Sequence, residues 1–191
     1  MWPLQGTASK EGRVCPHQTA FLLENWIRRL FQKPVKILED HLSQGDTVID
    51  LGCGPGFFTV DMAKMVGPTG NVIAIDLQPA MLERVRKKAL RAGVADRLLC
   101  HQCRADRLGL SCEADFILAY YMVHETPDPA SLFTEVKGLL RPGGRMLVVE
   151  PKLHVARAAF DTMLEKAVDA GMKVEATPSG KGGRAALLSE A

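Results

Sequence analysis

The sequence predicts an α/β fold in which a doubly wound, mainly parallel sheet lies between layers of helices. From residue 45 onward, strand-sized apolar segments alternate with helical segments, the pattern that places helices on the faces of a parallel sheet. The segment Ala114 to Tyr120 is almost wholly apolar, as in strands buried on both faces. A glycine-rich turn, Asp50 to Gly56, separates the first strand of this pattern from its first helix, where such folds bind ligands.

Length and composition indicate one globular domain. The chain has 191 residues, 47% of them hydrophobic and 24% charged, which is enough to bury a core. The net charge of +2 comes from interspersed acids and bases, so neither nucleic acid nor a membrane surface is indicated as the main partner. No apolar run approaches the ~20 residues that span a bilayer. Residues 1–12 do not resemble a signal peptide, and five cysteines, an odd number, favour free thiols in the cytoplasm.

The chain is expected to have three parts. Residues 1–14 are expected to be a flexible tail, residues 15–44 an N-terminal helical cap, and residues 45–191 the α/β body. Within the cap, His17 to Phe31 has apolar residues at helical spacing, and a second helix is expected from Pro34 until Gly45. The apolar stripe of this second helix is Val35, Leu38 and Leu42.

The body is expected to alternate strands with helices until two strands close it as a hairpin, with Lys181 among the glycines of its turn. The expected strands are Thr47 to Leu51, Asn71 to Ile75, Arg97 to Cys103, Ala114 to Tyr120, Arg145 to Glu150, Lys173 to Thr177 and Ala185 to Leu188. The expected helices are Phe57 to Val66, Pro79 to Ala92, Pro129 to Leu140 and Val155 to Ala170.

The glycine-rich turn is the strongest indication of function. Glycines at positions 52, 54 and 56 allow a sharp turn and let backbone N–H groups approach a ligand without interference from a Cβ atom. Asp76 ends the next strand about 20 residues further on, and its two oxygens can accept hydrogen bonds from both hydroxyls of a ribose. The alternative is that Asp50 and Gly52 serve only a tight strand-to-helix turn.

The details of this turn favour S-adenosylmethionine over a dinucleotide. A dinucleotide site requires G-x-G-x-x-G, whereas here the third glycine comes one position early and Phe57 stands in its place. Asp50 would repel a pyrophosphate but attracts the cationic sulfonium and ammonium groups of S-adenosylmethionine. A nicotinamide-dependent oxidoreductase is therefore the weaker alternative.

With these features the chain resembles the class I S-adenosylmethionine-dependent methyltransferases, in particular small members of the ubiquinone/menaquinone-biosynthesis type. The resemblance runs from about Lys36 to the C-terminus and implies that residues 45–191 form the cofactor-binding methyltransferase domain. It implies a Rossmann-like seven-stranded sheet of order 3-2-1-4-5-7-6 with strand 7 antiparallel. The motifs that carry it are Asp50 to Gly56, Asp76, Ala105-Asp106, Asp115 to Tyr121, and Leu139 to Gly144.

The resemblance also implies how the cofactor is held. Asp106 is expected to bond the adenine amino group, with Leu77 and Arg107 flanking the ring. From its place inside the glycine turn, Cys53 is expected to contribute its backbone. No metal site is expected. The expected cofactor-binding residues are Asp50, Gly52, Cys53, Gly54, Gly56, Phe57, Asp76, Leu77, Ala105, Asp106, Arg107 and Tyr120.

The candidate catalytic residues are His124 and Tyr120, at the carboxyl end of the fourth strand. Methyl transfer from a sulfonium chiefly needs positioning and the exclusion of water, so a base is optional. His124 has a pKa suited to taking a proton from a phenol or an enol. The alternatives are that His124 is structural and bonds Asp128, and that Tyr121 points away from Tyr120 into the core.

The acceptor is expected to be a small molecule of undetermined identity. Only Pro151 to His154 separate the fifth strand from the next helix, so the substrate site is minimal or completed by a second subunit, as in a homodimer. A non-catalytic S-adenosylmethionine-binding module is the second alternative. Cys100 and Cys103 are expected on opposite faces of a strand, as inert thiols rather than a metal or redox pair.

Overall fold

The computed structural model of the chain describes residues 32–191. The predicted tail, residues 1–14, and the first predicted cap helix, His17 to Phe31, lie outside the described residues. The second cap helix is present as α3 (Pro34–Leu38) and is shorter than predicted. Of the predicted apolar stripe, Leu38 is buried but Val35 is 48% exposed, because this short helix buries Pro34, Ile37 and Leu38.

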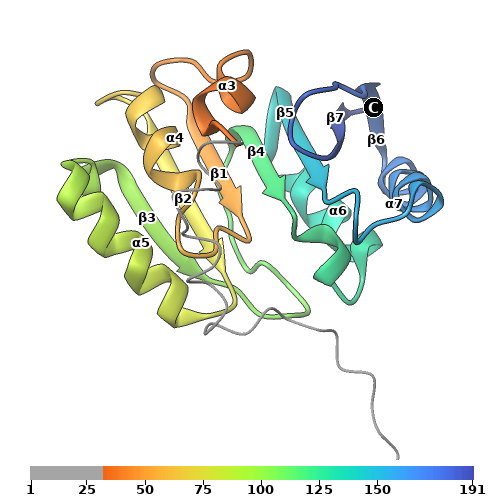
Figure 1. The fold of residues 1–191 in the computed structure, drawn as a ribbon, viewed down its shortest axis with the longest axis horizontal. Coiled ribbons are helices and arrows are strands. Elements are labelled where there is room, and N and C mark those ends of the chain that lie inside the picture. Colours follow the sequence, from red (N-terminus) through yellow and green to blue (C-terminus); the bar gives the residue numbers. More distant parts are fainter. Residues whose placement is uncertain (1–31) are drawn as a thin grey trace, which may run out of the picture.

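Within the described residues, the strands form a seven-stranded sheet of order β3-β2-β1-β4-β5-β7-β6 (Figure 1). Strands β1 to β5 pair in parallel, and β7 is antiparallel to both β5 and β6. The predicted hairpin and the strand order implied by the resemblance are therefore confirmed. The strands are β1 (Thr47–Leu51), β2 (Asn71–Asp76), β3 (Leu98–Gln102), β4 (Ala114–Tyr120), β5 (Leu140–Glu150), β6 (Met172–Ala176) and β7 (Arg184–Glu190).

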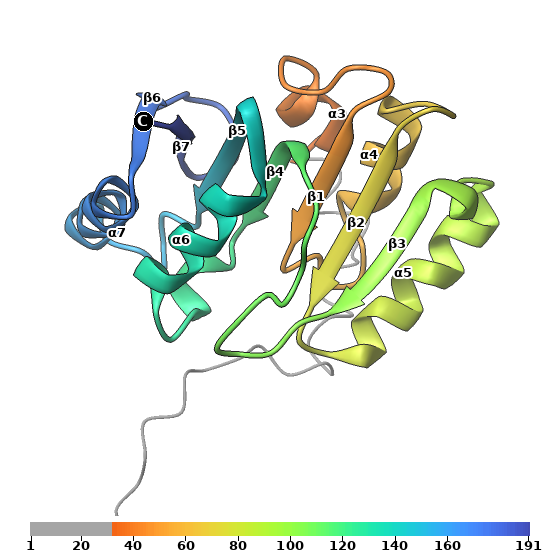
Figure 2. The same ribbon diagram turned by 180° about the vertical axis from the view of Figure 1, so that it is seen from behind.

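Helices cover both faces of the sheet. Figure 1 shows α3 and α4 (Thr59–Met65) in front of it, where α5 (Pro79–Ala92) also packs; Figure 2 shows α6 (Pro129–Leu139) and α7 (Arg157–Asp169) on the opposite face. Two short 3-10 turns complete the pattern, η2 (Ala95–Arg97) before β3 and η3 (Val123–Glu125) after β4.

The central strand β4 shows why its sequence is continuously apolar. Phe116 and Leu118 pack into the apolar layer beneath α3 and α4, whereas Ile117 and Ala119 pack into the layer beneath α6 and α7. All four side chains are at most 1% exposed. Burial on both faces, predicted from the uninterrupted apolar run, is therefore confirmed.

Strand β5 begins at Leu140 rather than at the predicted Arg145. Leu140 pairs with Ala114 before a register shift that leads to the pairing of Phe116 with Arg145. The intervening Pro-Gly-Gly segment therefore bulges within the strand instead of preceding it.

The parallel strands end together at the lower edge of the sheet in Figure 1. Leu51 lies beside Ile75 on one side and Ala119 on the other, and Ala119 lies beside Val148. Because neighbouring parallel strands end side by side, the segments that follow them meet at one place.

The loop between β6 and β7 reaches across to α3. Lys181 is 8% exposed, and its ammonium group donates hydrogen bonds to the carbonyl of Ile37 at 3.0 Å and to the Asp40 carboxylate at 3.4 Å. The predicted turn at Gly180 to Gly183 thus also fixes α3 against the body.

His41, which follows α3, packs its ring against Phe116 with centroids 5.4 Å apart and planes at 6°. Both ring nitrogens are buried and have no hydrogen-bond partner within residues 32–191. Burial lowers the pKa of His41, and the positive charges of Lys181 and Arg145 lower it further against the opposing effect of Asp40. The folded protein therefore holds this imidazole in its neutral form.

His41→Phe should raise the free energy of unfolding by about 1 kcal/mol, because the stacked ring is kept and two unsatisfied nitrogens are removed. Since the folded pKa is lowered from 6.5, the unfolded chain takes up the proton first. Titration of His41 thus has no effect on stability well above pH 6.5 and destabilises the folded state as the pH falls below that value. Between pH 7 and pH 5, urea unfolding should show that the variant loses less free energy of unfolding than the wild type. An equal loss in both proteins would contradict this assignment.

Candidate active site

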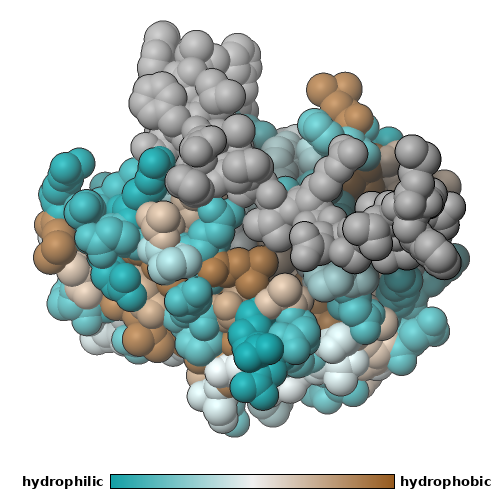
Figure 3. Space-filling model, turned by 90° about the horizontal axis from the view of Figure 1, so that it is seen from below, coloured by the Kyte–Doolittle hydropathy of each residue, from teal (hydrophilic) through white to brown (hydrophobic). Residues whose placement is uncertain are grey.

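A cavity of about 1380 Å³ lies where the parallel strands end, walled by the segments that follow β1 to β5. Seen from below, this edge presents apolar surface between hydrophilic side chains (Figure 3). Small-molecule sites typically measure ~300–1000 Å³. The cavity therefore has room for a cofactor and a second small molecule together.

The cavity brings together the predicted site residues with one exception. A Cβ atom on Gly56 would lie 3.0 Å from the Val85 side chain of α5, so this glycine allows the turn to pack closely against that helix instead of lining the cavity. The predicted site residues that line the cavity are Asp50, Gly52, Cys53, Gly54, Phe57, Asp76, Leu77, Ala105, Asp106, Arg107, Tyr120 and His124.

Gly52 and Gly54 have positive φ angles, 67° and 51°, but different surroundings. A Cβ atom on Gly52 would lie 2.8 Å from the Cβ atom of Met122, whereas a Cβ atom on Gly54 would meet nothing within 4 Å. Since Gly54 lines the cavity, its missing side chain leaves bare backbone for a ligand to approach.

Asp76 ends β2 and is 9% exposed. Its Oδ2 atom accepts the N–H of Gly54 at 2.9 Å, and its Oδ1 atom accepts the N–H of Gln78 at 2.8 Å. Burial raises the pKa of Asp76, and these backbone hydrogen bonds partly oppose that rise. Each oxygen has a second lone pair, so the carboxylate can hold the turn and still accept a bond from a ligand.

Asp50, in β1, is 2% exposed, and its Oδ2 atom accepts the hydroxyl of Thr59 at 2.5 Å. Burial raises the pKa of Asp50 to about 7; the Thr59 hydrogen bond opposes the rise and the charge of Asp76 adds to it. A cationic group in the cavity would favour the ionised form. Asp50 is therefore suited to a positively charged ligand group.

A tight turn after β3 carries Ala105 and Asp106 to the rim of the cavity, closed by backbone pairing of Arg104 with Arg107. The Asp106 carboxylate accepts a hydrogen bond from Arg104 Nε at 3.1 Å, which lowers the pKa of Asp106. Its side chain is 69% exposed, so the carboxylate is accessible as an acceptor.

Tyr120 and Tyr121 lie side by side, with ring centroids 4.3 Å apart. The prediction that Tyr121 points away from Tyr120 is wrong, because the chain leaves the strand at Tyr121 with a φ of 63°. Both hydroxyls bond the β6–β7 loop: Tyr120 donates to the Lys181 carbonyl at 3.1 Å and Tyr121 to the Gly182 carbonyl at 2.5 Å. A catalytic role for Tyr120 stays a prediction.

His124 stands in η3 on the cavity wall and bonds Glu150 at the end of β5. The His124 Nδ1 atom lies 2.5 Å from Glu150 Oε2, and this hydrogen bond raises the pKa of His124 against the lowering effect of burial. The alternative bond to Asp128 is wrong, since Asp128 caps α6 by accepting the N–H groups of Ala130 and Ser131. Sequence reasoning missed Glu150, although an acid ending an apolar strand was a signal for it.

The cysteines of the C-x-x-C pattern pack in different places. Cys100 packs beneath α5 near Leu82 and Val85, whereas Cys103 packs against the layer beneath α6 and α7. Burial raises the pKa of both thiols, for Cys103 to about 11. The two side chains thus lie on opposite faces of the sheet, as predicted from their spacing.

Comparison with known proteins places the chain in a family. Residues 42–183 match the family model described as a methyltransferase domain. The demethylmenaquinone methyltransferase of Lactobacillus johnsonii is 30% identical over 145 residues, covering 72% of this chain and 57% of the relative. The ubiquinone/menaquinone biosynthesis C-methyltransferase of Hahella chejuensis is 28% identical over 144 residues, covering 73% and 57%. The structure of an S-adenosylmethionine-dependent methyltransferase from Aquifex aeolicus superposes with a TM-score of 0.78 at 24% identity, covering 92% of this chain and 97% of that one.

Fold and site together define a class I S-adenosylmethionine-dependent methyltransferase domain, as the resemblance implied. The chain belongs to the methyltransferase-domain family, whose model matches most of its length. It spans 57% of the length of each of the two curated relatives above. Among the helices of residues 32–191, none is both long and apolar enough to cross a membrane.

Gly54→Ala should lower the affinity for S-adenosylhomocysteine about tenfold, because its Cβ atom enters the cavity. The left-handed backbone should cost ~1 kcal/mol of stability. Isothermal calorimetry measures the affinity and urea unfolding measures the stability.

Gly52→Ala is the matched control, with a similar φ but a Cβ atom that meets Met122. It should destabilise the fold more than Gly54→Ala does. Wild-type affinity for S-adenosylhomocysteine in Gly54→Ala would show that the turn does not contact the ligand.

Proposed function

We propose that this chain transfers the methyl group of S-adenosylmethionine to a small molecule that carries an ionisable hydroxyl group. The observation that carries the proposal is the construction of the cavity. The glycine turn and the carboxylates of Asp50 and Asp76 form one part of its wall, and His124, bonded to the buried Glu150, forms another.

The residues of the first part fit the cofactor. The bare backbone at Gly54 and the free lone pairs of Asp76 suit a ribose, and the exposed Asp106 carboxylate suits the adenine amino group. The buried carboxyl of Asp50 suits a cationic group. When bound there, S-adenosylmethionine supplies a methyl group on a sulfonium that is already an activated leaving group.

His124 supports a role for the chain in activating the acceptor. Its imidazole lines the cavity, where it can take a proton from a hydroxyl group. The apolar and aromatic side chains of Phe57, Tyr121 and Met122 line the same space and suit an aromatic acceptor. With these groups in place, the residues of this chain orient the acceptor, exclude water and remove its proton.

The names of the curated relatives refer to demethylmenaquinone and to ubiquinone and menaquinone biosynthesis. We therefore propose a reduced quinone as the acceptor of this chain, because a reduced quinone has phenolic hydroxyls on an aromatic ring. The carboxylates of Glu125 and Asp128 line the cavity, and they disfavour an anionic acceptor beside them.

The test is methyl transfer with defined acceptors. The purified chain is incubated with S-adenosylmethionine and, separately, a naphthohydroquinone, a catechol, a primary amine and a short RNA, and the product and S-adenosylhomocysteine are measured by mass spectrometry. Methylation of the hydroquinone or the catechol is expected. Tight cofactor binding without product from any acceptor would favour the non-catalytic binding module instead.

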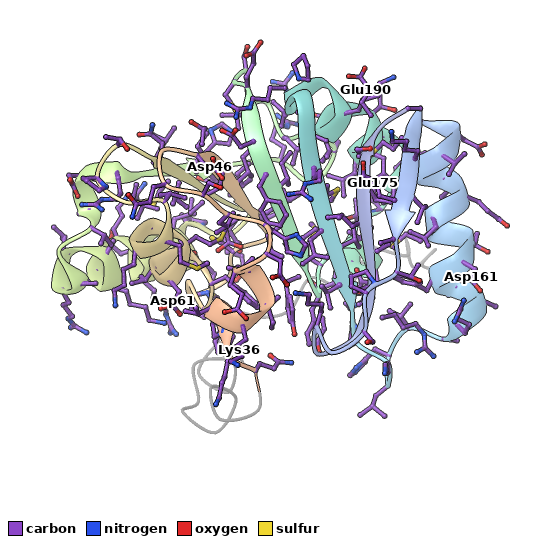
Figure 4. All side chains as sticks on the ribbon, turned by 90° about the horizontal axis from the view of Figure 1, so that it is seen from above. Lys36, Asp46, Asp61, Asp161, Glu175 and Glu190 are labelled. Carbon is purple, nitrogen blue, oxygen red and sulfur yellow. The ribbon has the colours of Figure 1, made fainter. Side chains whose placement is uncertain are left out.

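Asp76→Asn should weaken the binding of S-adenosylhomocysteine by about 1.5–3 kcal/mol, because charge-assisted hydrogen bonds to the ribose are lost. Asp161→Asn is the control, since Asp161 lies on α7 (Figure 4) and is not among the residues that line the cavity. Calorimetry that finds equal affinities in the two folded variants would remove Asp76 from the ribose site.

The affinity for S-adenosylmethionine should rise with pH through about 7, because the raised pKa of Asp50 keeps part of this carboxyl protonated below that value. A cationic ligand favours the carboxylate, so binding near neutral pH should release a proton. Calorimetry in buffers of different ionisation enthalpy measures this release. Asp50→Asn should bind more weakly and lose the release, whereas an unchanged release would assign it to another group.

The predicted cytoplasmic location and homodimer remain part of the proposal. Cys53, Cys100, Cys103 and Cys112 are all free thiols, which supports a reducing compartment. The short connection between β5 and α7 supports a second copy of the chain as a cover for the cavity. Sedimentation at micromolar concentration tests the dimer.

A further inference from the structure

Glu150 is the least exposed carboxylate of the described residues, at 0%. Burying an ionised carboxylate is costly unless its oxygens are bonded. The partners of Glu150 therefore indicate what the buried charge accomplishes.

Both oxygens of Glu150 bond the same residue. Oε2 lies 2.5 Å from the Nδ1 atom of His124, and Oε1 accepts the main-chain N–H of His124 at 3.3 Å. One contact fixes the ring and the other fixes the backbone of η3. Since Glu150 ends β5, next to β4 in the sheet, the rigid centre of the fold sets the position of His124.

The contact also sets which ring nitrogen of His124 carries the proton. An ionised carboxylate only accepts hydrogen bonds, so neutral His124 must carry its hydrogen on Nδ1 and its free lone pair on Nε2. The side chain is 28% exposed and lines the cavity. Within residues 32–191, no group forms a hydrogen bond with Nε2.

We propose that Glu150 is a positioning residue for methyl transfer, which holds His124 so that Nε2 takes the hydroxyl proton of the acceptor. This inference rests on the proposed function. In the reaction, the acceptor loses one proton and gains one methyl group, and the electron pair of the broken C–S bond stays with sulfur. His124 then passes the proton to water.

The charged groups around His124 determine the expected pH dependence. Glu150 on β5 and Glu125 on η3 raise the pKa of His124, and burial opposes them. Asp128 and His154 line the same cavity. Because a base must be deprotonated to act, removing the Glu150 charge should move the low-pH limb of the rate profile to lower pH.

The first experiment measures the imidazole directly in the full chain. Long-range ¹H–¹⁵N NMR of the wild type should show neutral His124 as the Nδ1–H tautomer. Glu150→Gln should move its titration to lower pH, whereas Glu175→Gln, an exposed residue of the edge strand β6 (Figure 4), should not. The Nε2–H tautomer in the wild type would overturn the proposal even if Glu150→Gln failed to fold.

The second experiment measures methyl transfer to a naphthohydroquinone. Glu150→Gln should lower kcat about 10- to 100-fold. Its KM for S-adenosylmethionine should stay within about twofold of the wild type, as expected when only acceptor activation is impaired. The low-pH limb should move together with the NMR titration, and Glu150→Asp should recover part of the rate.

If the low-pH limb stays in place in Glu150→Gln, His124 and Glu150 form only a structural ion pair. That result would overturn the proposal. Failure of the wild type to methylate any acceptor would instead count against the proposed function. In that case the tautomer and titration of His124 still decide whether Glu150 positions it.

Discussion

The carboxylate of Asp76 is the contact on which the site depends. It bonds the N–H of Gly54 in the turn after β1 and the N–H of Gln78 at the start of α5, so one side chain ties together two strand-to-helix connections. This is possible because β1 and β2 pair in parallel and end together. A left-handed turn of bare backbone would otherwise be free to change shape. Under the proposed function, the same two oxygens hold the turn and accept bonds from the ligand.

The site contains buried carboxylates, and burying a charged group is unfavourable for the free energy of folding. Asp50 and Glu150 are almost completely buried, and each bonds one side chain, the hydroxyl of Thr59 for Asp50 and the imidazole of His124 for Glu150. For Asp50 this cost raises the pKa, and a cationic ligand group would favour the ionised form again. Unfavourable burial of this kind is expected where a protein keeps a charged group for binding rather than for stability.

The wall near Tyr120 and Tyr121 is held from a distant part of the chain. Their hydroxyls bond the loop between β6 and β7, and Lys181 in that loop bonds α3. The antiparallel hairpin at the end of the sheet thus supports the cavity although it contributes none of its lining. The loop that the sequence predicted as a simple turn therefore connects α3 to the wall of the cavity.

The sequence by itself determined the fold class and most of the residues predicted to line the cavity. The alternation of segments, the apolar run of β4 and the glycines before Phe57 are local patterns, and local patterns report periodicity, burial and turn geometry directly. Tertiary structure decided the pairing of His124 with Glu150, 26 residues apart, and of Tyr121 with Gly182, 61 residues apart. It also placed Gly56 against α5 instead of in the wall of the cavity. These contacts depend on which strands become neighbours and on how the chain leaves each strand, and no local spacing encodes either.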